Sequence, residues 1–239
     1  MKVIAVIPAV MPAENEFRPC LYEIAGKPVL GHVLDRVARA GNLVGLVVAT
    51  TQAARDDAVV SFCESRGTPC FRGEAGNMLG LILAALKSTG QKGAVLVHPD
   101  SPLIDPAIVD HVANLVEMTD GMLDFVGTNL TPTYPKGMDV EGFTLAALED
   151  SDRRCAEPEI RAQGTLYLRT HSRLYRILSV KPEAELHRPE MVLNVATVDD
   201  LAKIEAILRH FEGRNDFTLA ELIAFVDKSA AEAADTKTA

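Results

Sequence analysis

Continuous apolar runs alternate with segments of helical periodicity along the first half of the chain, and this alternation constrains the fold more than any other feature. Residues 3–7, 43–49 and 94–98 are almost wholly apolar, as expected for strands covered on both faces. Each run precedes a segment in which apolar residues recur every three or four positions, the spacing of one helix face. Repeated strand–helix–strand units predict a three-layer α/β fold with a mainly parallel sheet.

Residues that favour helix starts stand where this pattern places the helix ends: Asp105, Thr197 and a capping box of Thr218 with Glu221. Residues 229–239 lack bulky apolar side chains and predict a flexible tail. Residues 1–228 are expected to fold as one domain.

The pattern changes from about residue 122 to residue 195. Short strand-like stretches there are separated by turn-rich segments: residues 125–127, 175–180 and 191–195. Such stretches cannot bury their apolar side chains alone. We therefore expect a β-rich inserted subdomain or dimerisation arm.

Charge and composition exclude several classes of protein. The net charge is −9 and no lysine- or arginine-rich run occurs, which argues against a nucleic-acid partner. No segment approaches the ~20 consecutive apolar residues of a membrane helix. The four cysteines form no C-x-x-C pair that would suggest a zinc site or a disulfide framework. We expect a cytoplasmic protein with no nucleic-acid or membrane partner.

Ligands of open parallel sheets bind at the carboxyl ends of the strands. Neither G-x-G-x-x-G nor a P-loop follows any predicted strand, so these two phosphate-binding devices are not expected. The strand ends instead predict functional positions in four segments: residues 8–18, 50–51, 72–74 and 99–101.

Among these positions, Asp100 is the strongest single candidate for a metal-binding residue. It follows the buried run 94–98, where a carboxylate reaches the ligand crevice. A hard oxygen ligand in that place can hold Mg²⁺ against a nucleotide phosphate. The alternative interpretation is a loop aspartate that caps a turn.

Five longer blocks of sequence carry more information than any single residue. They are LYEIAGKPVLGHV at 21–33, VVATT at 47–51, FRGE at 71–74, HPDSPLIDPAIVDHV at 98–112 and TPTYPKGMDVEGF at 131–143. With them the chain resembles, from Met1 to about Leu208, the cytidylyltransferases of polysaccharide biosynthesis. The spore-coat polysaccharide (SpsF-type) branch is the most similar, and the CMP-sialate and CMP-KDO synthetases are related to it.

This resemblance implies a nucleotidyltransferase-type α/β fold, a dimerisation arm, Mg²⁺ and transfer of CMP from CTP to a sugar hydroxyl with release of pyrophosphate. It places the nucleotide at Pro8, Ala9, Arg72 and Gly73, the sugar at Lys27, Asp139 and Glu141, and the metal at Asp100. Two alternatives stay open. The block around Asp139 and Glu141 could shape the arm, and Lys27 could be a solvated lysine.

The chain departs from the family where triphosphate and metal are bound. The family typically reads R-M-G-S-x-R-L-P-x-K after I-P-A, whereas this chain has VMPAENEFRP at 10–19. Val10 and Asn15 replace the two arginines, Pro19 replaces the lysine, and Pro12 replaces the glycine. Ala196 stands where the family has its second metal-binding aspartate, and the following acidic residues, Asp199 and Asp200, are better suited to the start of a helix.

These departures predict a divergent cytidylyltransferase-like protein. By resemblance it transfers CMP from CTP to a sugar acid or related sugar, with reduced or lost activity and a doubtful need for Mg²⁺. Each lost charge-assisted hydrogen bond costs roughly 1.5–3 kcal/mol. The alternative is a non-catalytic protein that binds a sugar or nucleotide sugar, and a homodimer is expected in either case.

Overall fold

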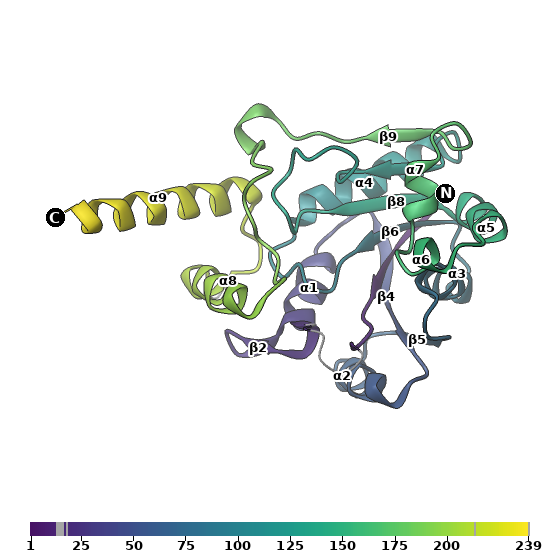
Figure 1. Cartoon of the computed structure of the whole chain (residues 1–239), viewed down its shortest axis with the longest axis horizontal. Helices are drawn as coiled ribbons and strands as arrows, with labels where there is room; N and C mark the ends of the chain where they lie inside the picture. The colour runs from purple at the N-terminus through teal and green to yellow at the C-terminus, as the bar shows by residue number, and fades with distance from the viewer. Residues whose placement is uncertain (13–16, 18, 213, 239) are drawn as a thin grey trace.

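A seven-stranded sheet runs through the middle of the molecule (Figure 1). The computed structural model describes residues 1–12, 17, 19–212 and 214–238. The strand order is β5 (Cys70–Gly73), β4 (Leu43–Thr51), β1 (Val3–Pro8), β6 (Gly93–Val97), β8 (Val140–Thr144), β7 (Phe125–Gly127) and β9 (Ile177–Ser179). The first four strands are parallel, β8 is antiparallel to both neighbours, and β9 is parallel to β7. The predicted α/β fold with a mainly parallel sheet is confirmed.

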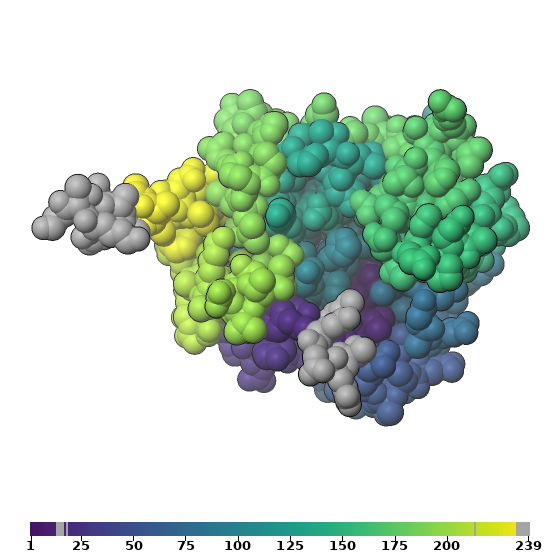
Figure 2. Space-filling view, viewed as in Figure 1, coloured from purple at the N-terminus to yellow at the C-terminus, as the bar shows by residue number. Residues whose placement is uncertain are grey.

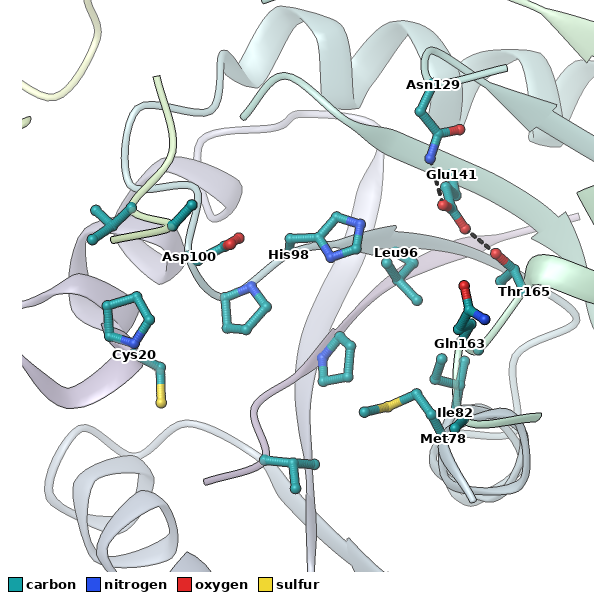
Figure 3. A pocket seen from close by; sticks show the side chains of 18 of the residues that line it. Cys20, Met78, Ile82, Leu96, His98, Asp100, Asn129, Glu141, Gln163 and Thr165 are labelled. Carbon is teal, nitrogen blue, oxygen red and sulfur yellow. Dashed lines mark hydrogen bonds between the residues drawn. The ribbon is translucent and has the colours of Figure 1, made fainter. Parts of the chain in front are cut away.

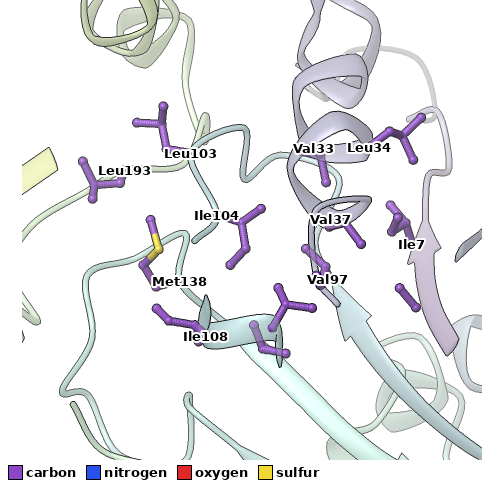
Figure 4. Close-up of a cluster of buried hydrophobic side chains, with 14 of the residues drawn as sticks. Ile7, Val33, Leu34, Val37, Val97, Leu103, Ile104, Ile108, Met138 and Leu193 are labelled. Carbon is purple, nitrogen blue, oxygen red and sulfur yellow. The ribbon is translucent and has the colours of Figure 1, made fainter. Parts of the chain in front are cut away.

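Helices cover both faces of the sheet because successive side chains of each strand point to opposite sides. Val3, Ala5 and Ile7 of β1 belong to one apolar cluster, whereas Ile4 and Val6 belong to the other. The first cluster, shown in part in Figure 4, also contains side chains of α1 (Val29–Val37), α2 (Asp57–Ser65), α4 (Pro106–Thr119), α8 (Val198–His210) and α9 (Leu219–Thr238). The second contains side chains of α3 (Met78–Ser88), α5 (Leu145–Arg154) and α7 (Leu166–Thr170). The result is the expected three layers.

The predicted helix starts are confirmed. Asp105 accepts a hydrogen bond from the Ala107 N–H at 2.8 Å, and its other oxygen accepts one from the Leu219 N–H at 2.6 Å. One carboxylate therefore serves the first turns of both α4 and α9. The predicted box at the start of α9 is present as well, since Glu221 accepts from the Thr218 N–H at 2.8 Å.

Asp200 acts at the start of α8, as the sequence suggested. Its carboxylate accepts hydrogen bonds from the N–H and the hydroxyl of Thr197, both at 2.8 Å. It also accepts one from the N–H of Ala196 at 3.1 Å. The pKa of Asp200 is lowered: its partial burial acts against the charged form, and these hydrogen bonds outweigh that effect.

The segment from residue 122 to residue 195 differs from the expected β-rich arm. Its three strands complete the edge of the central sheet, and the helices α5, α6 (Pro158–Arg161) and α7 lie between β8 and β9. Residues 191–195, expected as a strand, form only an isolated bridge at Val192. The strands of this segment are extended because they pair with the central sheet. Helix α5 was not expected because most of its residues are polar, so the apolar spacing of a helix face is weak there. Whether this segment pairs two subunits stays a prediction.

A few short elements connect this framework. A two-stranded hairpin of β2 (Glu23–Ile24) and β3 (Lys27–Pro28) precedes α1, and short 3-10 turns occupy Pro19–Leu21, Ala54–Asp56 and Ala184–Leu186. Helix α9 projects from the body of the molecule (Figure 1) and continues to Thr238. The segment expected to be a tail is therefore helical up to Thr238, and the flexibility of residues 229–239 stays a prediction. None of the helices in the described ranges has the length and apolar character that a membrane span requires.

Candidate functional site

A cleft of about 430 Å³ opens where β1 and β6 end. In the space-filling view the face is hollowed between the purple and teal segments of the sheet and the green lobe that carries α5 to α7 (Figure 2). Pro8, at the end of β1, and His98 to Asp100, just after β6, line this cleft. The cleft therefore lies at the strand ends, as expected for an open α/β sheet.

Asp100 lies on the same side of the cleft as Cys20 (Figure 3). Its carboxylate accepts a hydrogen bond from Nδ2 of Asn194 at 3.2 Å and a longer one from the hydroxyl of Ser101 at 3.3 Å. Its backbone carbonyl accepts from the N–H of Val195 at 2.8 Å. These bonds hold the segment that contains Val195 and Ala196 beside Asp100.

Glu141 forms the centre of the opposite wall (Figure 3). It lies on β8 opposite Leu96 of β6, and only 4 % of its surface is exposed. Oε1 accepts a hydrogen bond from Nδ2 of Asn129 at 2.6 Å, and Oε2 accepts one from the hydroxyl of Thr165. The buried carboxylate therefore has fixed geometry, and its remaining lone pairs can accept hydrogen bonds from a ligand.

Asp139 precedes Glu141 by two residues and lies just before β8, outside the lining of the cleft. Burial raises the pKa of Asp139, and the negative charges of Glu141 and Asp100 raise it further, although His98 acts in the opposite direction. The pairing of Val97 with Val140 places His98 next to Asp139 across the two strands. Three carboxylates and an imidazole thus lie close enough to interact where β6 ends and β8 begins.

The carboxylates near the cleft do not form a metal centre. Within the part of the chain that the structure describes, no three His, Cys, Asp or Glu side chains are arranged to hold one ion. Ala196 lines the cleft beside Asp100 and offers no ligand atom in its side chain. Mg²⁺ bound through one carboxylate needs phosphate or water for its other ligands. The donor set therefore does not fit a resident cation.

Three predicted residues lie outside the main cleft. Arg72 donates to the carbonyl of Thr51 at 3.0 Å and pairs with Asp57 at 2.7 Å. Lys27 pairs with Asp35 at 2.8 Å and lines a different cavity, of about 540 Å³, against residues 208–217.

Gly73 lies against the side chain of Leu81. A Cβ at Gly73 would lie 2.7 Å from Cδ1 of Leu81, so this side chain would have to shift to accept a larger residue. The structure thus brings Pro8, Asp100 and Glu141 together in the cleft, with Ala9 adjoining Pro8 in sequence. It separates them from Arg72, Gly73 and Lys27.

The first described residues of the altered loop are held by a buried carboxylate. Asp56 accepts a hydrogen bond from the N–H of Met11 at 2.6 Å, and it also accepts from the N–H of Thr51 at 3.1 Å. Asp56 is fully buried. This backbone donor of the loop is therefore already satisfied. The prediction made for Asn15 lies outside the described residues, as does the rest of the loop at positions 13–16 and 18.

Sequence reasoning missed four polar residues of the cleft: Asn129, Gln163, Thr165 and Arg169. Asn129 lies two residues after the end of β7. Its place after a strand is the only feature of the sequence that could have marked it as a cleft residue, and a strand of just three residues is hard to recognise from sequence. The other three lie in or beside α7.

A family model, the MobA-like NTP transferase domain, matches residues 20–156, more than half of the chain. The chain belongs to this family. This MobA-like NTP transferase is 25 % identical to the spore coat polysaccharide biosynthesis protein SpsF of Bacillus subtilis, over 77 % of this chain and 75 % of that protein.

Two further relatives are cytidylyltransferases by name. The 3-deoxy-manno-octulosonate cytidylyltransferase of Desulfatibacillum aliphaticivorans is 33 % identical over 55 % of this chain and 51 % of that protein. A solved cytidylyltransferase from Leptospira borgpetersenii superposes with a TM-score of 0.90 and 26 % identity, covering 97 % of this MobA-like NTP transferase and 96 % of that chain. The resemblance to cytidylyltransferases predicted from the sequence is confirmed.

Proposed function

We propose that this protein is a divergent cytidylyltransferase that keeps a sugar-binding cleft and transfers CMP from CTP to a sugar acid slowly or not at all. The observation that carries the proposal is that the two sides of the cleft differ in their polar groups. The wall around Glu141 is polar and internally hydrogen bonded, whereas the side around Asp100 has no described cation to meet a triphosphate.

The side around Asp100 is unfavourable for polyphosphate. Val10, Pro19 and Ala196 line it with apolar groups, and the carboxylate of Asp100 adds negative charge. In the transfer, a sugar hydroxyl would attack the α-phosphorus of CTP and pyrophosphate would leave. The charge that develops on the phosphates must be neutralised for this step. Val10, Asn15 and Pro19 replace three cations of the family loop. Because each lost charge-assisted hydrogen bond costs roughly 1.5–3 kcal/mol, the rate or affinity falls by a factor of order 10³ or more.

The opposite wall suits a polyhydroxylated ligand. Glu141 has free lone pairs after accepting from Asn129 and Thr165, and the amide of Gln163 lies beside it (Figure 3). Sugar hydroxyls are donors that such acceptors bind. Of the residues expected to hold the sugar, we therefore propose Glu141 as the direct contact, with Asp139 behind it. Pro8 and Ala9 are proposed to border the nucleotide.

A divalent cation is proposed only as part of the bound nucleotide. Asp100 could approach such an ion, but the phosphates would have to supply its other ligands. Arg72 and Gly73 support the nucleotide side indirectly, because they fix the end of β5 against β4 and α3.

Pyrophosphate release tests the proposal directly. The full-length protein is incubated with CTP, 3-deoxy-manno-octulosonate and Mg²⁺, and calorimetry measures CTP binding in parallel. We expect weak or no binding at millimolar CTP and turnover far below the ~10 s⁻¹ of a median enzyme. Micromolar, Mg²⁺-dependent CTP binding with turnover on the scale of seconds would contradict the proposal.

A non-catalytic protein that binds a sugar or nucleotide sugar is the second candidate, and the intact wall around Glu141 favours it. The same experiment separates the two. Binding of the sugar without any pyrophosphate above the protein-free control indicates the binding protein, and slow but measurable release indicates the weakened enzyme.

We also propose a homodimer. Strand β9 is an edge of the sheet, so one side of its backbone is unpaired within the chain, and Leu174 and Leu178 beside it are exposed. A second copy could cover this edge through the segment between residues 122 and 195. Light scattering at micromolar concentration that gives a mass near 25.8 kDa would contradict the proposal.

A further inference from the structure

The second cavity, of about 540 Å³, lies between the β2–β3 hairpin, helix α1 and the connection from α8 to α9. Among the described residues, none lines both this cavity and the main cleft. The hairpin packs against α8 (Figure 1), and the N–H of Ala25 donates to Glu205 of α8 at 3.3 Å. The volume lies in the range of small-molecule sites, so the cavity can hold a metabolite.

Basic side chains gather in the lining of this cavity. They come from the hairpin, from α1, and from α8 and the connection after it: Lys27, Arg36, Arg209 and Arg214. The described lining has only two carboxylates, those of Asp35 and Glu212. The chain as a whole carries a net charge of −9, so this lining has the opposite sign to the protein average. Such a local excess of positive charge attracts anions.

Arg36 contributes a positive charge that no described carboxylate contacts. The side chain is only 2 % exposed. Its three guanidinium nitrogens donate to backbone carbonyls, those of Ile104, Asn215 and Phe217. These neutral acceptors satisfy the donors but leave the charge without an ion pair, and a charge in buried surroundings acts more strongly than one in water. Arg36 therefore attracts an anion in the cavity through its charge and not by contact.

Lys27 and Arg209 can contact a ligand directly, since more than half of each side chain is exposed. The Lys27 ammonium has three donors and gives one to Asp35 at 2.8 Å. Asp35 also pairs with Arg66, so two cations share this carboxylate. Arg209 binds Glu205 through Nε and Nη2, and its Nη1 has no partner among the described residues. Exposed ion pairs contribute little to stability, so a ligand can compete for these groups.

His32 adds a hydrogen-bond acceptor to the lining. Its Nε2 lies 2.9 Å from the carbonyl oxygen of Ile24, so this nitrogen carries the proton and Nδ1 keeps a lone pair. Burial lowers the pKa of His32, and the charges of Lys27 and Arg36 lower it further, although the bond to the Ile24 carbonyl acts in the opposite direction. The imidazole is therefore neutral at pH 7 and suits a hydroxyl donor.

We propose that this cavity binds a small phosphorylated metabolite, with Lys27 and Arg209 donating hydrogen bonds to the oxygens of its phosphoryl group. A phosphate ester carries a charge of about −1.5 to −2 at pH 7 and three acceptor oxygens, which suits several cations better than a carboxylate does. The remaining volume holds the sugar or nucleoside part, whose hydroxyls can donate to His32 and Glu212. This second site is independent of CMP transfer in the main cleft.

Four probes and a matched pair of double variants test the proposal. Glucose 6-phosphate, CMP, glucuronate with its single negative charge, and neutral glucose are each titrated into the full-length protein and followed by calorimetry and amide NMR. Lys27→Gln/Arg209→Gln removes both proposed contacts. Lys87→Gln/Arg154→Gln is the control, because these residues are also about half exposed and paired with carboxylates but do not line the cavity. Thermal unfolding checks that each variant is folded.

We expect wild type to bind at least one of the two phosphate esters with a Kd of about 1 mM or lower. Glucuronate and glucose should bind at least about tenfold more weakly. The Lys27→Gln/Arg209→Gln variant should lose at least about tenfold in affinity for the ester, because two charge-assisted hydrogen bonds are removed, and the control should stay within twofold of wild type. Lys27→Gln alone provides the readout if the double variant is unfolded. The ester should shift the amide signals of Gly26 and Asn215, and the tighter of the two esters identifies a sugar phosphate or a nucleotide as the source of the phosphoryl group.

Four outcomes would overturn the proposal. They are no binding of either ester at about 10 mM, binding of glucuronate as tight as that of the esters, equal losses in the two double variants, and ester-induced shifts confined to the amides around Asp100 and Glu141. The last result would place both esters in the main cleft. Binding of an ester that depends on Lys27, in a protein that releases no pyrophosphate from CTP, would contradict an enzymatic role of the cleft and leave the second site standing.

Discussion

Nδ2 of Asn129 lies 2.6 Å from Oε1 of Glu141, and the hydroxyl of Thr165 donates to the other oxygen of the same carboxylate. The end of β7, the strand β8 and the start of α7 therefore meet at one buried group. A ligand that binds there contacts a wall whose geometry is set by three segments of the chain at once.

Glu141→Ala should destabilise the fold. It leaves the buried donors of Asn129 and Thr165 without an acceptor, and we expect the free energy of unfolding to fall by about 2–4 kcal/mol. Urea denaturation followed by circular dichroism measures the change. Glu141→Gln keeps an acceptor oxygen and should cost less, and the exposed Glu185→Ala should stay within about 0.5 kcal/mol of wild type. Equal stability of the two alanine variants would contradict this account of the wall.

Arg36 should be a major contributor to stability. Its guanidinium donates to the carbonyls of Ile104 at 2.5 Å and Phe217 at 2.8 Å and lies 3.8 Å above the Phe217 ring. Burial lowers its pKa to about 10, so it stays charged at neutral pH.

Arg36→Met leaves these carbonyls unpaired, and we expect a loss of about 3 kcal/mol in the free energy of unfolding. Arg39→Met is the matched control, since Arg39 is exposed and makes one side-chain hydrogen bond, to Asn215. Stability of Arg36→Met within 0.5 kcal/mol of the control would show that the guanidinium does not tie the segment before α9 to the core.

The ion pair of Asp124 with Arg176 should make stability depend on pH in acid. The hydrogen bonds from the Arg176 side chain lower the pKa of Asp124, and the Arg176 N–H adds to this effect against partial burial. A carboxyl whose pKa is lower in the folded state stabilises the fold above its unfolded pKa of ~3.9. That contribution is lost as the pH falls through the folded pKa.

Wild type should therefore lose more of its thermal stability than Asp124→Asn between pH 5 and pH 2, by a few degrees in Tm. Scanning calorimetry at several pH values measures the difference. Asp227→Asn is the control, because Asp227 is mostly exposed and its contact with Arg188 is long, at 3.7 Å. Parallel pH profiles of wild type and Asp124→Asn would exclude this pair as the cause.

Asp100→Asn tests the carboxylate that we propose could approach a cation of the bound nucleotide. The variant keeps the shape of the side chain and removes the charge that would attract a cation. Thermal shift with a panel of nucleotides and nucleotide sugars, with and without Mg²⁺, first finds a ligand of wild type. We expect any Mg²⁺-dependent stabilisation to disappear in Asp100→Asn, while the Tm without ligand falls by a few degrees at most. Stabilisation that survives the substitution would remove Asp100 from the site.

Ala196→Asp should move the cleft toward the family pattern. Ala196 lies beside Asp100, so a second carboxylate there supplies the ligand that the donor set lacks. We expect Mg²⁺ or Mn²⁺ to raise the Tm of this variant more than that of wild type, and CTP binding to become dependent on the ion. Ala196→Asn has the same size without the charge and should behave as wild type. An identical response of the two variants would show that the missing carboxylate is not what limits cation binding.

Local patterns were enough to predict the main strands and the helix starts. The apolar runs at residues 3–7 and 94–98 became β1 and β6, and Asp105 caps α4 through its own side chain. The pattern failed in α5, whose exposed face is strongly polar, and at residues 191–195, where apolar residues pack in the core without forming a strand. Burial alone does not distinguish a strand from an irregular buried segment.

The amino-acid sequence by itself determined the family, the alternation of strands and helices, and the position of Asp100 after a buried strand, because each depends on residues close together in the chain. The tertiary structure alone decided which distant side chains meet. In the folded chain, Asn129 and Thr165 donate hydrogen bonds to Glu141. Arg72 instead binds Thr51 and Asp57, outside the cleft. Strand order and register set these encounters, and they arise from the packing of the whole sheet.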